Sequence, residues 1–177
     1  MKPSPSQRKI RILVAEDHVL MRAGLVAAAN HEPDLEVVAE VADGRLLLHA
    51  FRQQPVDVVV LDWRMRGMDG VEIIKVLRAE AGAAPILILN RHGDGGDIAR
   101  AMQAGAAGYL VKGMALEHIL MGIRTVHAGE RYLPHEMASQ LEEWTNSGSV
   151  GEKIKRDTKS DKERSNSDRG WKGFLRK

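Results

Sequence analysis

Five short apolar segments recur along the first two thirds of the chain, and they constrain its fold more than any other feature. Each is rich in β-branched residues or apolar at successive positions, as expected of strands that are buried on both faces. They occupy residues 10–15, 35–41, 56–61, 85–89 and 108–111. Such runs are typical of a parallel sheet that is covered by helices on both sides.

Helical patterns with apolar residues three or four positions apart lie between these segments, at 19–30, from 44 onward, at 71–77, at 98–104 and at 116–128. Asp43 and Asp97 are predicted N-caps, and Gly105 and Gly129 are predicted stops. Five strands that alternate with five helices predict parallel βαβ units with right-handed crossovers. The expected fold is therefore a doubly wound α/β sheet, which binds ligands at the carboxyl ends of its strands.

Composition divides the chain into four predicted segments: a flexible N-terminus at 1–8, the folded domain at 9–129, an extension at 130–144 and a tail at 145–177. The extension is expected to contain a helix that begins near Pro134. The tail has a net charge of +5, whereas the residues before it have a net charge of −3. Because the tail is polar and carries few large apolar side chains, it is predicted to be disordered.

Several classes of protein are disfavoured at this point. The chain has no cysteine, which excludes disulfides and thiolate metal sites. Its first residues are too short and too soon interrupted for a signal peptide, and no apolar run reaches the length of a membrane span. We therefore expect a cytoplasmic protein without a membrane partner.

Polar side chains gather where the predicted strands end. Glu16 and Asp17 follow the first strand, Asp62 follows the third, Asn90 follows the fourth, and Lys112 follows the fifth. Neighbouring carboxylates repel one another unless a cation neutralises them, and Mg²⁺ prefers oxygen ligands. An acidic cluster, a divalent cation and a lysine together indicate a pocket for phosphoryl transfer.

Four motifs in order carry a resemblance to a known family. They are ILVAEDHVLMRAGL, VVVLDWRMRGMDGVE, AGAAGYLVKG and VHAGERYLPHEMASQL. Over about residues 10–143 the chain resembles the receiver domains of bacterial two-component response regulators, in the NarL/FixJ-like (LuxR-type) group. The resemblance implies a flavodoxin-like (βα)5 fold with an extra C-terminal helix.

The same resemblance implies a role for each residue of the acidic pocket. Asp62 would accept a phosphoryl group from a sensor histidine kinase or a phosphotransfer protein. Asp17 and Asp62 would bind Mg²⁺, with help from Glu16 and the backbone carbonyl of Arg64. Lys112 would contact the acyl phosphate.

The resemblance also implies a switch, and here the sequence departs from the family. Tyr109 would report phosphorylation to a surface formed by the fourth helix, fifth strand and fifth helix, which could also form a homodimer.

The sequence departs from the family at three positions near the pocket. Asn90 stands where the family has Thr or Ser, Arg91 where it has a small residue, and Arg66 where it has proline. Arg91 could block the pocket or pair with Asp62. A degenerate receiver that signals without ordinary phosphorylation therefore stays open as an alternative. Residues 93–97 are expected to form a loop beside the pocket.

Two other classes were weighed against a receiver. The NarL/FixJ-like group usually continues into a helix-turn-helix, but no recognition helix is evident after residue 144, so DNA binding is doubtful. A truncated DNA-binding regulator that acts through its basic tail remains an alternative. An enzyme is disfavoured, because Arg64 stands where an aspartate-dependent phosphohydrolase needs a second carboxylate. Glu16, Asp17 and His18 likewise replace the Gly-rich loop of a dinucleotide enzyme.

Overall fold

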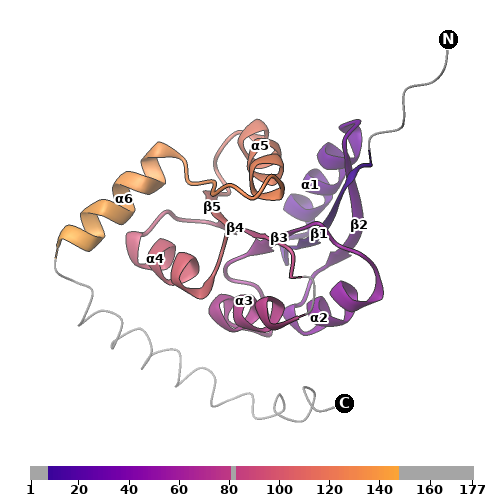
Figure 1. Cartoon of the computed structure of the whole chain (residues 1–177), viewed down its shortest axis with the longest axis horizontal. Coiled ribbons are helices and arrows are strands. Elements are labelled where there is room, and N and C mark those ends of the chain that lie inside the picture. Colours follow the sequence, from indigo (N-terminus) through magenta and orange to yellow (C-terminus); the bar gives the residue numbers. More distant parts are fainter. Residues whose placement is uncertain (1–7, 81–82, 148–177) are drawn as a thin grey trace.

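The computed structural model describes residues 8–80 and 83–147 and shows one five-stranded parallel sheet with helices on both faces (Figure 1). The strands are ordered β2-β1-β3-β4-β5. The elements are β1 (Ile10–Ala15), α1 (Val19–His31), β2 (Leu35–Val41), α2 (Gly44–Gln53), β3 (Val58–Asp62), α3 (Gly70–Ala79), β4 (Ile86–Asn90), α4 (Gly95–Ala104), β5 (Gly108–Val111), α5 (Leu116–His127) and α6 (His135–Asn146). This is the predicted doubly wound, flavodoxin-like architecture.

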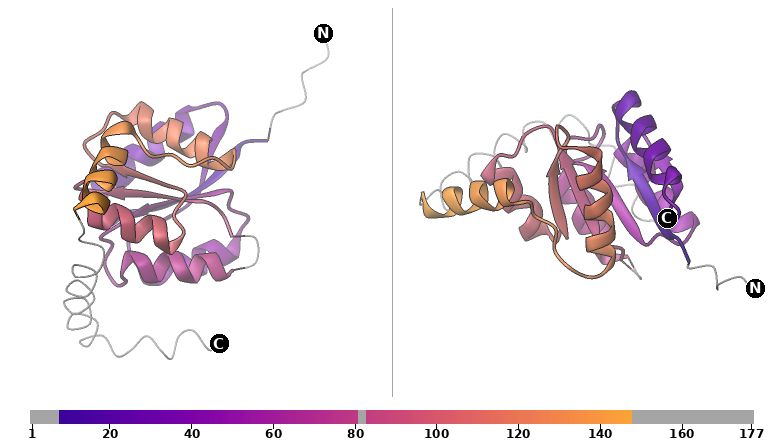
Figure 2. Two further views of the ribbon diagram at one scale, coloured as in Figure 1. Left: turned by 60° about the vertical axis from the view of Figure 1, so that its left-hand side comes forward. Right: turned by 90° about the horizontal axis from the view of Figure 1, so that it is seen from above.

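The two faces of the sheet are covered by different helices (Figure 2). Side chains alternate along each strand, so that Leu13 and Ala15 face α2 and α3 while Ile12 and Val14 face α1 and α5. The inner strands β3 and β4 are buried along their whole length. Because each of these strands is paired with a neighbour on both sides, the polar residues at their carboxyl ends are held in fixed positions.

The helices α2, α3 and α4 each begin at an aspartate cap, and one predicted cap was wrong. Asp43 accepts a hydrogen bond from the Arg45 backbone N–H at 2.9 Å, as predicted. Asp97, however, lies inside the first turn of α4, because Asp94 caps that helix by accepting from the Gly96 N–H at 2.7 Å. The end of α4 agrees with the prediction, since Gly105 has a left-handed backbone with φ 109°.

The interpretation of residues 93–97 as a loop was wrong for residues 95–97, which form the first turn of α4 where the C-terminal helix packs against it. α6 lies against α4, as Figures 1 and 2 both show. A Cβ atom on Gly95 would come within 2.4 Å of the Gln140 backbone oxygen and 2.5 Å of the Trp144 Cβ. Glycine at this position therefore lets the two helices approach closely, and their contact supports the first turn of α4.

The segment after α5 is joined to the sheet rather than separate from it. Tyr132 forms a bridge to Gly108, and its backbone oxygen accepts a hydrogen bond from the Tyr109 N–H at 3.0 Å. α6 ends at Asn146, two residues beyond the predicted boundary at 144. The predictions for residues 1–7 and for the tail from 148 onward lie outside the described residues. Within the described ranges, no helix combines the length and the apolar character needed to cross a membrane.

Candidate functional site: an acidic pocket at the carboxyl edge of the sheet

The predicted carboxylates lie together because β1 and β3 are neighbours. Ala15 is paired with Leu61 in the register of these strands, so Glu16 and Asp62 leave the sheet side by side. One oxygen from each of Glu16, Asp17 and Asp62 lies within 4.8 Å of the others. This edge is also the point where the strand order reverses, which is the usual ligand position in such sheets.

Lys112 provides the counter-charge from the end of β5. Its Nζ lies 2.8 Å from both oxygens of Glu16 and 2.8 Å from Asp62 Oδ2. Burial raises the pKa of Glu16. Burial alone would lower the pKa of Lys112, but its hydrogen bonds to Asp62 and Glu16 outweigh that effect and raise the pKa instead. The pocket therefore holds an ammonium group that is charged at neutral pH.

Backbone groups orient the two buried carboxylates. The His18 N–H donates to Glu16 Oε1 at 3.0 Å, and the Arg64 N–H donates to Asp62 Oδ1 at 3.0 Å. Glu16 is 1% exposed and Asp62 is 3% exposed. Both side chains are therefore fixed, and the loop that contains Arg64 is tied directly to the predicted acceptor.

Each of the three arginines near the pocket has a different environment. The Arg66 Nε lies 3.4 Å from Asp17 Oδ2, and Arg64 lies 3.3 Å from Asp97. Arg91 has an exposed side chain that forms no ion pair with any described residue. The hypothesis that Arg91 pairs with Asp62 is therefore not supported, because Lys112 is the ionic partner of Asp62.

The predicted switch residues form a hydrogen-bonded group on the α4 side of the sheet. The Asn90 Nδ2 donates to the Tyr109 hydroxyl at 2.6 Å and to Asp97 Oδ2 at 3.1 Å. The Tyr109 hydroxyl in turn donates to the His92 carbonyl at 3.1 Å. Tyr109 is completely buried, and this burial raises the pKa of its hydroxyl.

Asp97 is the member of this group that the sequence interpretation missed. It was read as a helix cap, although two aspartates, Asp94 and Asp97, flank a Gly-Gly pair and either could serve as the cap. A cap at Asp94 places Asp97 inside the helix, where its carboxylate can reach Asn90. The spacing of Asp94 and Asp97, three positions apart at the start of a helix, could have indicated that the first caps the helix and the second lies within it.

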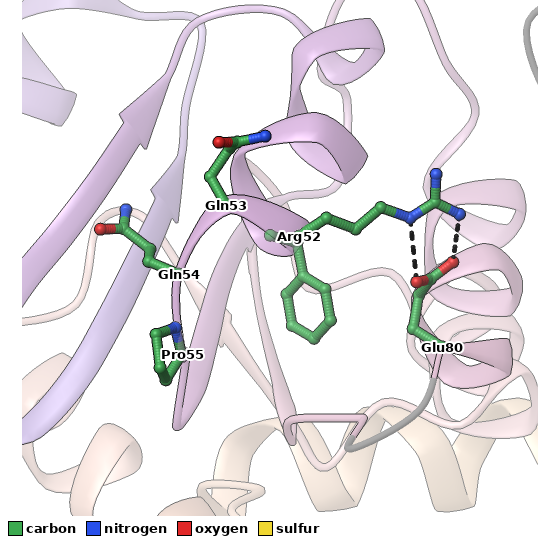
Figure 3. A pocket seen from close by; sticks show the side chains of 6 residues that line it. Arg52, Gln53, Gln54, Pro55 and Glu80 are labelled. Carbon is green, nitrogen blue, oxygen red and sulfur yellow. Dashed lines mark hydrogen bonds and ion pairs between the residues drawn. The ribbon is translucent and has the colours of Figure 1, made fainter. Parts of the chain in front are cut away.

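A separate hollow of about 400 Å³ lies far from the acidic pocket (Figure 3). It is formed where α2 and α3 end, near the amino end of β3, and its walls include Phe51, Gln54 and Pro55. Its charged side chains, Arg52 and Glu80, are paired with each other at 2.7 Å. Because these two charged side chains bind each other, the hollow offers no free charged group for catalysis.

Comparison with known proteins supports the same interpretation of the fold. The family profile of the response regulator receiver domain matches residues 12–124, which include the whole acidic cluster. The chain belongs to this family. Its fold and sequence are those of a receiver from two-component signalling systems, with relatives in the NarL/FixJ-like group.

Relatives of this receiver include the response regulator UvrY of Escherichia coli, which is 35% identical over 132 residues. These residues are 75% of this chain and 61% of UvrY. A nitrate/nitrite response regulator protein homolog of Haemophilus influenzae is 36% identical over 139 residues, 78% of this chain and 67% of that protein. The chain therefore spans about three fifths of the length of the first curated relatives that it matches.

Solved structures show the same fold. A LuxR-family two-component response regulator from Aurantimonas sp. SI85-9A1 is 31% identical with a TM-score of 0.72, over 76% of this chain and 96% of that one. The response regulator ChrA of a heme-sensing two-component system is 35% identical with a TM-score of 0.64, over 76% of this chain and 65% of ChrA. Both solved structures therefore share the receiver fold over about three quarters of this chain.

Proposed function

We propose that this receiver accepts a phosphoryl group on Asp62 from a sensor histidine kinase or a phosphotransfer protein, with Mg²⁺ as cofactor. The observation that carries the proposal is the arrangement around Asp62. Two further carboxylates and the Lys112 ammonium surround it at the carboxyl edge of the sheet. A phosphoacceptor needs such a combination of nucleophile, metal ligands and fixed positive charge.

The donor groups of the pocket fit a magnesium ion. Glu16, Asp17 and Asp62 offer carboxylate oxygens, which this cation prefers. Glu16 Oε2 is buried and accepts no hydrogen bond, although the Lys112 ammonium lies nearby. The backbone carbonyl of Arg64 is proposed as a further ligand, because the N–H of the same residue already binds Asp62. When bound, Mg²⁺ would supply positive charge to the oxygens of the phosphoryl group.

The residues of the pocket perform the remaining steps. An oxygen of Asp62 attacks phosphorus, the P–N bond of the donor phosphohistidine breaks, and its electron pair stays on the imidazole of the donor. Lys112 begins within 2.8 Å of the acceptor, so its charge can follow the phosphoryl oxygens as they arrive. Glu16 retains the other contact of Lys112 and keeps the ammonium in the pocket.

Incubation with acetyl phosphate and MgCl₂, followed by intact mass measurement, tests this function. We expect one phosphoryl adduct, its loss in Asp62→Asn, and its loss when EDTA replaces Mg²⁺. Glu72→Gln removes an exposed carboxylate outside the pocket and should leave labelling unchanged. An adduct that persists in Asp62→Asn would refute Asp62 as the acceptor.

A degenerate receiver is the second candidate, and one observation favours it. The Asn90–Tyr109 hydrogen bond, made entirely by side chains of this chain, holds the switch tyrosine in a completely buried position. If this arrangement is the signalling state, the chain would act without ordinary phosphorylation. The absence of an adduct, under conditions that label a control receiver, would favour this candidate over the first.

The output of the receiver is also a proposal. We propose a cytoplasmic signalling protein without enzymatic turnover, which dimerises through its α4-β5-α5 surface. In the described structure α6 packs against α4 and Tyr132 pairs with Gly108 of β5, so the segment after α5 already occupies part of that surface. Direct regulation of DNA is less well supported. An electrophoretic mobility assay that compares the full chain with a chain ending at Trp144 tests it, and DNA binding lost with the tail would establish that role.

A further inference from the structure

The side chain of Asn90 has used all its hydrogen-bonding hydrogens. A primary amide carries two N–H donors, and these are committed to the Tyr109 hydroxyl at 2.6 Å and to Asp97 Oδ2 at 3.1 Å. Its oxygen accepts from the Arg91 backbone N–H at 2.8 Å. Asn90 is 1% exposed. Neither donor is therefore left for an oxygen of a phosphoryl group on Asp62.

Asp97 is itself held in place from several directions. Arg64 lies 3.3 Å from Asp97 Oδ2, and Arg100 lies 3.7 Å from Asp97 Oδ1. The Arg100 guanidinium also lies over the Trp63 ring at 5.7 Å from its centre. The carboxylate is 13% exposed and is part of the first turn of α4. It is thus a fixed, charged acceptor that binds the Asn90 amide more firmly than water would.

We propose that Asp97 is a positioning residue that holds the Asn90 amide on Tyr109 and α4, so that Asn90 must leave Asp97 before it contacts a phosphoryl group. Arg64 joins the phosphoacceptor pocket to α4, because its backbone N–H binds Asp62 and its side chain binds Asp97. Asp97 therefore opposes the rearrangement that phosphorylation of Asp62 requires. This inference rests on the proposed function of Asp62.

The consequence has a definite direction. A ligand shifts an equilibrium by the difference between its affinities for the two states. Weakening the Asp97 contact should therefore improve the binding of a phosphoryl analogue, whereas a purely structural aspartate would leave it unchanged or impair it. Asp97→Asn keeps the shape of the side chain but removes its charge. Glu72→Gln is the matched control, since it removes one acidic charge from the first turn of the adjacent helix α3.

The first measurement uses the unphosphorylated protein. The side-chain amide resonances of Asn90 in a ¹H–¹⁵N NMR spectrum should move and exchange faster with solvent in Asp97→Asn, and should stay in place in Glu72→Gln. Unchanged Asn90 resonances in Asp97→Asn would overturn the proposal. This readout does not depend on whether Asp62 accepts a phosphoryl group.

The second measurement is a titration with beryllofluoride and Mg²⁺, followed through the backbone amide resonance of Asp62. We expect Asp97→Asn to bind about 5- to 10-fold more tightly than the parent, as the loss of a charged hydrogen bond would allow. In an Asn90→Ala background the same substitution should have almost no effect, because Asp97 acts through Asn90. Equal or weaker binding by Asp97→Asn, or an undiminished effect without Asn90, would overturn the proposal. If no variant binds beryllofluoride, the proposed function fails, and the Asn90 resonances alone decide the role of Asp97.

Discussion

The carboxyl edge of the sheet has two halves that are organised in opposite ways. On the β1–β3 side, Glu16 and Asp62 converge on the Lys112 ammonium in a shared pocket. On the β4–α4 side, Asn90 donates hydrogen bonds both to Asp97 and to Tyr109. In the first half two carboxylates share one ammonium group, whereas in the second every N–H donor of the Asn90 side chain already has a partner within the chain. We therefore expect that breaking the hydrogen bonds of Asn90, rather than assembling the acceptor pocket, limits the conformational response to phosphorylation.

Substitution of Lys112 should have the largest effect, because it removes the positive charge of the acceptor half. Lys112→Met leaves Glu16 and Asp62 as buried neighbours with no cation. We expect phosphorylation by acetyl phosphate to slow by roughly 100-fold, as when a charge-stabilising donor is removed from an active site. The free energy of unfolding should fall by about 3 kcal/mol, measured by urea denaturation, because breaking a buried ion pair leaves an uncompensated charge.

Mg²⁺ provides the control for this substitution. If the three carboxylates bind the cation as proposed, Mg²⁺ should stabilise Lys112→Met more than the parent, since it replaces the missing charge. Equal stabilisation of both proteins by Mg²⁺ would contradict the proposed metal site.

Gly95 tests whether α6 supports the β4–α4 half. Gly95→Ala would place a Cβ 2.4 Å from the Gln140 backbone oxygen, so α6 must move. We expect a loss of about 2 kcal/mol in the free energy that holds α6 on α4, as is usual for overpacking. Amide hydrogen exchange of α6 measures this loss, and the Asn90–Asp97 contact should loosen with it.

Gly24 offers a matched control in α1, where an added Cβ would meet nothing within 4 Å. Gly24→Ala should stabilise the protein by roughly 0.5–1 kcal/mol, because alanine loses less conformational freedom in a helix. Unchanged exchange of α6 in Gly95→Ala would show that the helix does not depend on this contact.

The two halves of the edge also differ in how far the sequence could predict them. The acceptor half follows from a local pattern, since alternating strands and helices bring the strand ends of Glu16, Asp62 and Lys112 to one edge. The ion pairs of Lys112 then follow from simple charge attraction. The roles proposed for these residues from the family resemblance remain predictions, because phosphorylation and metal binding have still to be measured.

The β4–α4 half depends on contacts between distant parts of the chain. Asp94 rather than Asp97 caps α4, and Gln140 and Trp144, from a distant part of the chain, pack against Gly95 at the start of that helix. Residues 95–97 are helical at this contact, although their Gly-rich composition alone is typical of a loop. The pairing of Arg66 with Asp17 was likewise unforeseen, because it requires the conformation of the loop after β3.

Asn90→Thr should sharpen the difference by restoring the hydroxyl residue that the family usually has here. Threonine is too short to keep both contacts with Tyr109 and Asp97, so the stability of the unphosphorylated protein should fall by about 1 kcal/mol. Phosphorylation should become about 3- to 5-fold faster, because a hydroxyl is freed for the phosphoryl group. Intact mass against time measures the rate. Asn30→Thr, at an exposed side chain in α1, is the control. An equal increase of the phosphorylation rate in Asn30→Thr would show that the freed hydroxyl at position 90 is not the cause.

Arg91 should have the smallest effect, because its cationic side chain is exposed and unpaired among the described residues. It lies at the end of β4, so its charge can attract an anionic phosphodonor, but water and salt screen an exposed charge strongly. We expect Arg91→Ala to slow labelling by acetyl phosphate about 2-fold at low ionic strength, and the difference to vanish near 0.5 M salt, where the Debye length is short. Arg131→Ala removes another exposed arginine, between α5 and α6, and should not change the rate. A faster reaction at every salt concentration would instead show that Arg91 obstructs the pocket, and the barrier would then lie in access to Asp62 as well as in the release of Asn90.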